Sequence, residues 1–174
     1  MRVVAGALGG RPIAAQKGES IRPTADRVRE ALFSILGDVS GLDVLDLFAG
    51  TGAVAIEAIS RGAAAATLVD TDVSAAEQNV AALGIEGRCS IVRGDAIGFL
   101  GRDRGTYDLV YCDPPYKLAR RFASDLEELL PERLRTGARV IVESPAADPI
   151  ELGLPLLDAR KYGQTAVRIH GAPR

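Results

Sequence analysis

The residues best suited to chemistry form one short sequence, Asp113-Pro114-Pro115-Tyr116. It directly follows Tyr107–Cys112, an apolar run that predicts a buried strand. Asp113 offers a carboxylate and Pro114 a carbonyl oxygen, and neither proline has an N–H that competes for these acceptors. Tyr116 offers a ring on which a base can stack, an interaction worth roughly 1–3 kcal/mol. Asp113, Pro114 and Tyr116 are therefore candidate catalytic residues, which would hold a planar exocyclic amine with its lone pair facing a methyl donor.

A glycine-rich segment upstream predicts a cofactor loop. Gly50–Ala55 fits the pattern G-x-G-x-x-G/A between a strand and a helix, so Gly50 and Gly52 would let the backbone approach a ligand closely. Asp70 closes the next predicted strand, where a carboxylate can accept hydrogen bonds from both hydroxyls of a ribose. The pattern serves NAD and S-adenosylmethionine alike. A glycine turn needed only for packing, and for Asp113 a simple type I turn, are the structural alternatives.

Asp46, at the end of the first predicted strand, favours S-adenosylmethionine. A carboxylate would repel a pyrophosphate, whereas S-adenosylmethionine carries an ammonium and no phosphate. Phe48 and Ala49 lie between Asp46 and the glycines and belong to the same candidate cofactor site. Asp95 and Ala96 follow the third predicted strand, where the carboxylate could accept the adenine amine and the Ala96 N–H could face the ring. Asp95 also suits a helix N-cap, and the two roles are compatible.

Around these motifs, the hydrophobic pattern predicts strands that alternate with helices. The predicted strands are 44–48, 66–70, 89–93, 107–112 and 139–143, and the predicted helices are 53–61, 74–83, 96–100 and 118–130. Near-continuous apolar strands separated by helices indicate a parallel sheet covered on both faces. Residues 155–160 and 165–169 predict a closing antiparallel hairpin. An earlier helix is expected to begin after Thr24 as its N-cap and to end at Gly37.

The N-terminal part is basic and predicts a binding arm or a solvated surface. Residues 2–16 predict two short strands around Gly9-Gly10. Residues 1–36 hold six basic and three acidic side chains, a balance of +3, whereas the whole chain has a net charge of −2. The net charge therefore argues against a protein that coats nucleic acid through bulk charge, but not against a local basic patch. The candidate RNA contacts are Arg2, Arg11, Arg22, Arg27, Arg29 and Lys117.

Composition limits the class of protein. A chain of 174 residues with 47% hydrophobic and 25% charged residues predicts one globular domain, with a monomer as the default. Its two cysteines, Cys89 and Cys112, lie in strand-like runs, which suits a reducing cytoplasm. With His170 as the only histidine and no Cys/His cluster, no metal is expected. No run approaches the ~20 apolar residues that span a bilayer, so no membrane is expected.

The chain resembles class I S-adenosylmethionine-dependent methyltransferases that modify amines, and one family in particular. Segments 1–6, 10–11, 22–30, 45–52 and 113–116 resemble the RsmD family, bacterial methyltransferases that act on a guanine exocyclic amine in small-subunit ribosomal RNA. The most specific stretch is Arg22–Glu30, R-P-T-x-D-R-V-R-E, which methyltransferases in general lack. Asp70 departs from the glutamate of many relatives. Glu143-Ser144-Pro145 also resembles the family, although its chemistry alone gives Glu143 no role.

The resemblance implies a Rossmann-like α/β fold with a mostly parallel seven-stranded sheet that ends in an antiparallel hairpin. Residues 1–20 would form an N-terminal β-hairpin arm that contacts RNA, and residues 21–174 the methyltransferase domain. The expected reaction transfers a methyl group from S-adenosylmethionine, leaving S-adenosylhomocysteine, to the N2 amine of a guanine. The expected partner is 16S ribosomal RNA in the small subunit or an assembly intermediate.

Three other interpretations compete with this one. An adenine-N6 methyltransferase on DNA or RNA would also use Asp113–Tyr116, but a DNA enzyme needs a recognition domain for which 174 residues leave little room. A dehydrogenase fits the glycines and Asp70 and leaves Asp113–Tyr116 unexplained. An RNA-binding assembly factor is the alternative from another class of protein.

Overall fold

The computed structural model describes residues 1–15, 23–115 and 119–173, and its centre is one seven-stranded sheet. The spatial order of the strands is β3-β2-β1-β4-β5-β7-β6. The strands are β1 (Asp43–Leu47), β2 (Ala65–Asp70), β3 (Cys89–Arg93), β4 (Tyr107–Cys112), β5 (Leu134–Pro145), β6 (Leu156–Tyr162) and β7 (Thr165–Gly171). The first five strands pair in parallel, and β7 pairs antiparallel with both β5 and β6. The predicted parallel sheet and closing hairpin are therefore confirmed.

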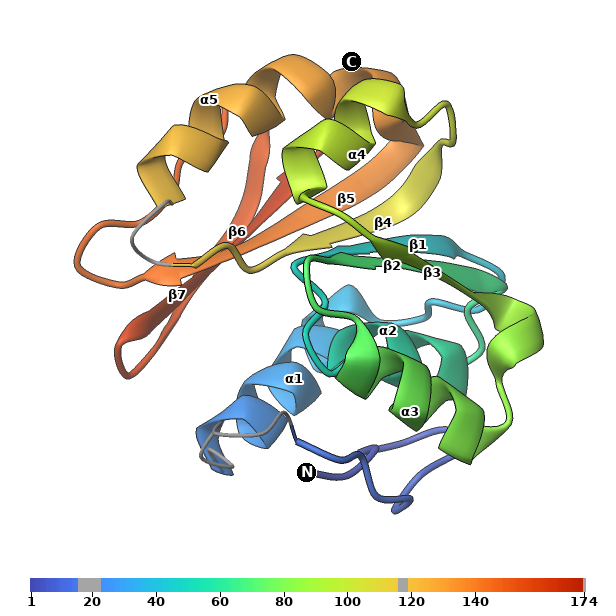
Figure 1. Ribbon diagram of the computed structural model, residues 1–174. Coiled ribbons are helices and arrows are strands. Elements are labelled where there is room, and N and C mark those ends of the chain that lie inside the picture. Colours follow the sequence, from blue (N-terminus) through green and yellow to red (C-terminus); the bar gives the residue numbers. More distant parts are fainter. Residues whose placement is uncertain (16–22, 116–118, 174) are drawn as a thin grey trace.

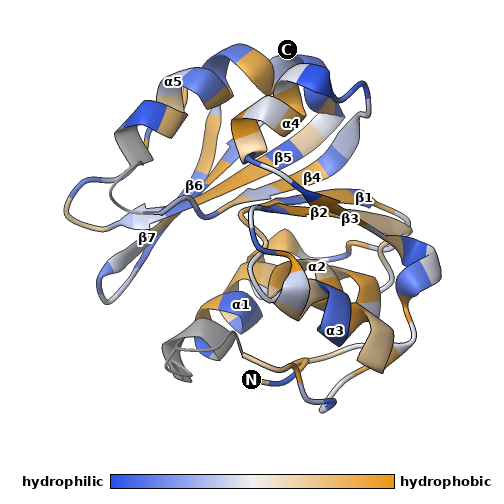
Figure 2. Cartoon of the chain, viewed as in Figure 1, coloured by the Kyte–Doolittle hydropathy of each residue, from blue (hydrophilic) through white to orange (hydrophobic). Residues whose placement is uncertain are grey.

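Helices cover both faces of the sheet (Figure 1). The helices are α1 (Pro23–Leu36), α2 (Ala53–Ser60), α3 (Ser74–Leu83), α4 (Ala96–Arg102) and α5 (Ala119–Leu129), with 3₁₀ turns η1 (Glu86–Arg88) and η3 (Pro131–Arg133). α1, α2 and α3 lie on one face, and α4 and α5 on the other. Each face has its own apolar core, and Figure 2 shows hydrophobic residues concentrated on the strands and on the helix surfaces between the layers. Among the described residues, no helix is both long and apolar enough to cross a membrane.

Several predicted boundaries differ from the structure, most of them by one or two residues, and two of the differences have a clear physical reason. α1 begins at Pro23, so Thr24 lies inside the helix and the expectation that it caps the helix was wrong. Proline suits a first helical turn because its missing N–H would have no partner there. β5 begins at Leu134 rather than at residue 139, because its polar first half still pairs with β4 through Tyr107 and Leu134. The predicted limits of α3, β3 and β4 are confirmed.

The N-terminal arm, residues 1–15, packs against the core. One antiparallel bridge joins Arg2 and Pro12, in place of two strands, because the chain between them closes through successive turn hydrogen bonds. Val3 and Ile13 are buried in the core on the α1–α3 face. The Ala14 N–H donates to Asn79 Oδ1 of α3 at 2.8 Å.

Two residues of α2 hold the arm. Ser60 accepts hydrogen bonds from the N–H groups of Ala7 and Leu8. The other residue is Glu57, whose side chain is 0% exposed. Its carboxylate accepts hydrogen bonds from the N–H groups of Val4 and Ala5, at 2.7 and 3.0 Å. Arg61 binds it at 2.7 Å, and Arg29 of α1 lies 3.6 Å away. One buried acid therefore joins the arm, α1 and α2.

Arg29 was expected to contact RNA, and the structure contradicts this expectation. Its side chain is only 4% exposed, and it donates a hydrogen bond to the Arg2 carbonyl at 2.5 Å. It lies beneath the arm and beside Glu57. A buried guanidinium that is already held by protein groups cannot reach a phosphate.

We expect Glu57→Ala to lower the free energy of unfolding by about 3–5 kcal/mol, because the buried Arg29 guanidinium would lose its charge partner. Urea denaturation would measure this loss. The control is Glu77→Ala, which removes an exposed acid of α3. A loss for Glu57→Ala as small as for the control would show that the buried acid does not hold the arm.

Candidate functional site

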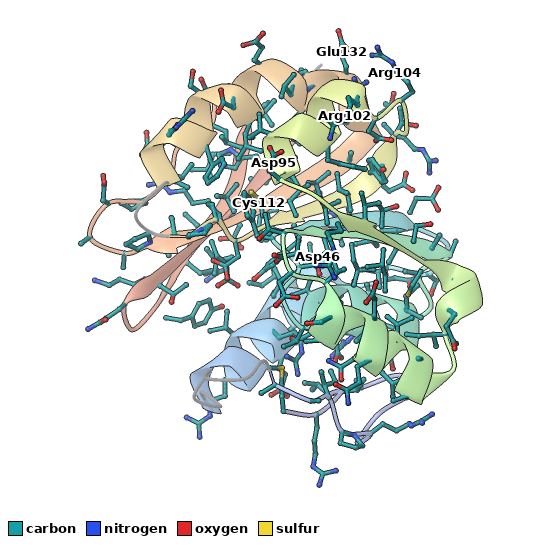
Figure 3. The ribbon with its side chains drawn as sticks, in the orientation of Figure 1. Asp46, Asp95, Arg102, Arg104, Cys112 and Glu132 are labelled. Atoms are coloured by element: carbon teal, nitrogen blue, oxygen red, sulfur yellow. The ribbon has the colours of Figure 1, made fainter. Side chains whose placement is uncertain are left out.

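The candidate site lies where the parallel strands end. β1 and β4 are neighbours at the centre of the sheet, and their following loops carry the glycines and Asp113. Ligands of open parallel sheets bind at this edge. Figure 3 shows Asp46, Asp95 and Cys112 gathered in the middle of the molecule, whereas Arg104 and Glu132 lie at the far edge. The candidate cofactor residues and Asp113 therefore come together at one edge of the sheet.

The loop from Phe48 to Gly52 turns the chain sharply from β1 into α2. Phe48 has φ of 64°, and it is the only non-glycine with a positive φ in the described part of the chain. Such a conformation costs free energy and is common at binding sites. Gly52 has φ of 76°, and a Cβ there would lie 2.7 Å from a methyl carbon of Leu68. The loop therefore requires a residue without a side chain at Gly52.

Asp70, at the end of β2, fixes this loop. One of its oxygens accepts the Gly50 N–H at 2.7 Å, and the other accepts the Asp72 N–H at 3.1 Å. A carboxylate has about four lone-pair positions, so acceptor capacity remains for a ligand hydroxyl. The predicted contact of Asp70 with a ribose stays a prediction.

Asp46 is the most unusual acid in the site. It is 1% exposed, and its Oδ2 accepts the Ala55 N–H at 3.1 Å. Its Oδ1 is buried without a hydrogen-bond partner among the described residues. Burial, with the nearby charges of Asp113, Asp70 and Glu143, raises the pKa of Asp46 to about 7. A buried acceptor without a partner costs free energy, and a cationic ligand group would relieve that cost.

Asp95 and Ala96 lie where β3 leads into α4. The Asp95 carboxylate accepts the Gly98 N–H at 2.6 Å, which confirms the predicted N-cap. Ala96 is buried in the core beneath α4 and α5. The contacts with an adenine ring that we expect from these two residues remain predictions.

Asp113 directly follows β4, and Glu143 lies near the end of the neighbouring strand β5. Cys112 of β4 pairs with Val142 of β5, so the residue after each lies at the same level. Asp113 is exposed and Pro114 is buried. The Tyr111 hydroxyl donates to Glu143 Oε1 at 2.6 Å. Burial and the charge of Asp113 raise the pKa of Glu143 to about 7, although the Tyr111 hydrogen bond opposes this.

Glu143 had no predicted role, and the structure places it beside the candidate catalytic residues. The one sequence signal was an acid that directly follows the apolar run Val140–Val142 of β5. Tyr116, Lys117 and Arg22 lie outside the described residues. No group of three or more His, Cys, Asp or Glu side chains within the described ranges could hold a metal ion.

The other candidate RNA contacts do not lie at the strand ends. Arg2 donates to the Gly10 carbonyl at 2.7 Å, within the arm. Arg11 donates to the carbonyls of Ala82 and Leu83 at the end of α3, at 2.8 and 3.3 Å. Arg27 is exposed on α1. The arm arginines Arg2 and Arg11 are exposed side chains that also serve local structure.

The sheet order and the strand-end site define a Rossmann-like methyltransferase fold. An RNA methyltransferase from Salinibacter ruber, solved with S-adenosyl-L-homocysteine, shares the fold with a TM-score of 0.69 at 20% identity, over 88% of this chain and 95% of that one. The model of the family described as "Conserved hypothetical protein 95" matches residues 1–171. The chain belongs to this family, the RsmD family.

Two similar proteins from Escherichia coli extend the match over nearly the whole chain. "Ribosomal RNA small subunit methyltransferase D" of strain K12 is 34% identical over 98% of this chain and 89% of its own. The solved structure of the E. coli protein yhhF has a TM-score of 0.83 at 32% identity, over 99% of this chain and 97% of that one. Sequence and fold therefore agree on the family.

We expect Asp46→Asn to stabilise the ligand-free protein as the pH rises. The native pKa of about 7 exceeds the ordinary value of 3.8, so the wild type loses stability as the pH rises through 7. The amide carries no charge, so between pH 5 and pH 8 the variant should gain roughly 5 °C in melting temperature relative to the wild type. The comparison is Asp38→Asn, since hydrogen bonds from Ser40 lower the pKa of Asp38. A pH-independent difference for Asp46→Asn would contradict the expectation.

Proposed function

We propose that this chain transfers a methyl group from S-adenosylmethionine to the N2 amine of a guanine in 16S ribosomal RNA of the small subunit. Membership of the RsmD family supports methylation of ribosomal RNA. The observation that carries the finer proposal is the Glu143 carboxylate beside Asp113, held by the Tyr111 hydroxyl. Each part of the proposal depends on a different group of residues.

The cofactor part depends on Asp46 and the glycine loop. The buried Asp46 Oδ1 lacks a partner, and the ammonium of S-adenosylmethionine would supply one. Gly50 and Gly52 let the backbone approach the cofactor, and Asp70 has acceptor capacity left for its ribose. Phe48, Ala49, Asp95 and Ala96 complete the proposed cofactor site. When bound, S-adenosylmethionine supplies an electrophilic methyl group on its sulfonium.

The choice of guanine depends on Glu143. Guanine carries N1–H and N2–H donors on two nitrogens that are both bonded to C2, whereas adenine has an acceptor at N1 beside its amine. Asp113 and the Pro114 carbonyl would accept from the N2 amine. An ionised Glu143, with Tyr111 on Oε1, would accept N1–H through Oε2 and would repel the lone pair of adenine N1. This arrangement favours guanine and disfavours the adenine alternative.

The reaction then requires alignment and the removal of one proton. The guanine N2 forms a bond to the methyl carbon while the bond from carbon to sulfur breaks, and sulfur keeps the electron pair. The methylated nitrogen loses a proton to the Asp113 carboxylate, which is exposed and passes it to water. We assign stacking of the base to Tyr116, and RNA contacts to Arg2, Arg11, Arg22, Arg27 and Lys117.

We expect the purified protein to form N2-methylguanosine in 16S RNA when it is supplied with labelled S-adenosylmethionine and small subunits from cells that lack it. Mass spectrometry of the digested RNA identifies the nucleoside. Asp113→Ala should reduce the rate by about 100-fold or more while the cofactor still binds, since the amine loses its acceptor. N6-methyladenosine as the product would contradict the guanine assignment, and an active Asp113→Ala variant would contradict the role of Asp113.

We expect methyl transfer at saturating cofactor to rise between pH 6 and pH 8, because Glu143 must be ionised and its pKa is about 7. Glu143→Gln should flatten this profile and lower the rate by about 10–100-fold, the worth of one hydrogen bond to a charged group. Glu132→Gln, at the far edge of the molecule, is the matched control (Figure 3). An unchanged profile in Glu143→Gln would exclude Glu143 from guanine selection.

A further inference from the structure

A groove between α1 and β6 lies outside the site described above. Its volume is about 500 Å³, within the usual range of ligand clefts. Arg27, Glu30 and Ser34 line it from α1, and Arg160 and Tyr162 line it from β6. Arg160 and Tyr162 have no part in the proposed reaction, and no sequence motif pointed to them.

The strand register connects this groove to Glu143. Glu143 of β5 pairs with Val167 of β7, and Val167 pairs with Arg160 of β6. Adjacent strands lie about 4.8 Å apart, so the backbones at Glu143 and Arg160 are about 10 Å apart along one row. Paired residues share a face of the sheet, and Val167 belongs to the core on the α1–α3 face.

The next row confirms this direction. Pro145 pairs with Thr165, and Thr165 pairs with Tyr162. Tyr162 is partly buried against the same α1–α3 core. The groove therefore opens on the face of the sheet that carries Tyr111 and Glu143, beyond the strand end that holds Asp113. A chain that delivers a base to Asp113 can continue across this face into the groove.

We infer that the groove binds a nucleotide that flanks the target guanine in the same RNA strand. The inference rests on the proposed function, and it adds the path that the RNA takes across the protein. An amine inside a duplex is out of reach of a strand-end site, so the target base must leave its stack. Sequence-specific recognition of RNA mostly targets single-stranded loops, in which the neighbours of a splayed base are also unpaired and available to contact protein.

The groove is lined by groups that can contact the phosphate and the base of a nucleotide. This lining suits a nucleotide better than a ligand that offers only negative charge. Arg27 and Arg160 are exposed cations that can bind phosphate. Arg160 also bonds to Asp158 Oδ2 through Nε at 3.2 Å and Nη2 at 3.0 Å, and the two N–H groups of its Nη1 are further donors. Tyr162 presents an aromatic ring for stacking. Glu30 and Ser34 can accept hydrogen bonds from the amino groups of a base, which a surface selecting only for negative charge would not offer.

The test is steady-state methylation of the small subunits described above, at several salt concentrations. Arg160→Ala and Arg27→Ala should each raise KM for the subunit by about 5–10-fold, with kcat within about twofold. Each should also reduce the slope of log KM against log salt by about one, the effect of one lost phosphate contact. Tyr162→Ala should raise KM with little change in the slope, and Tyr162→Phe should recover most of that loss because it keeps the ring.

The controls separate this inference from the proposed function. Arg102, the last residue of α4, and Arg104 are exposed arginines away from the groove (Figure 3), and the double variant Arg102→Ala/Arg104→Ala should keep the wild-type KM. Calorimetry should give every variant the wild-type affinity for S-adenosylmethionine.

Wild-type KM and salt slope in Arg27→Ala and Arg160→Ala, with an active wild type, would overturn the inference alone. A raised KM with an unchanged slope in both arginine variants would assign the groove to a ribosomal protein and also overturn it. A wild type that transfers no methyl group would refute the proposed function and this inference together.

Discussion

The parallel pairing of β1, β4 and β5 is the constraint on which the site depends. It brings Asp46, Asp113 and Glu143 to one edge of the sheet, close enough for the charge of Asp113 to raise the pKa of both Asp46 and Glu143. Such a gathering of acids opposes folding, because burial and mutual repulsion both disfavour the charged forms. The two apolar cores that cover the sheet must supply the free energy that keeps these acids together.

Much of the fold and the location of the site could be predicted from the sequence, because both depend on local patterns. Apolar strands of five or six residues separated by helices predicted the parallel sheet, and the glycines after β1 predicted the sharp turn into α2. Asp95 shows the strength of such local rules, since its predicted N-cap is present. The start of α1 shows their limit: Thr24 and Pro23 both suit a helix start, and the pattern did not separate them.

Contacts between residues that are far apart in the sequence could not be predicted. Arg29 carries the same charge as Arg27 on the same helix, yet one is buried against Glu57 and the other is exposed, because the arm covers only one side of α1. The role proposed for Glu143 depends on Tyr111 of β4 and on Asp113, which directly follows β4. Arg160 and Tyr162 lie on the face of the sheet that carries Glu143 because of the register between β6 and β7. None of these contacts produces a periodic pattern of residues in the sequence from which it could be predicted.

The docking of the arm also has a consequence for the order of folding. Residues 1–15 leave the ribosome before their partners Glu57, Ser60 and Asn79, which are 52–65 positions later in the chain. The arm therefore cannot reach its final place until α2 and α3 have been synthesised and packed. During translation, Val3 and Ile13 remain exposed to water in the interval. Contacts of such long sequence separation form slowly, so attachment of the arm belongs to the late steps of folding.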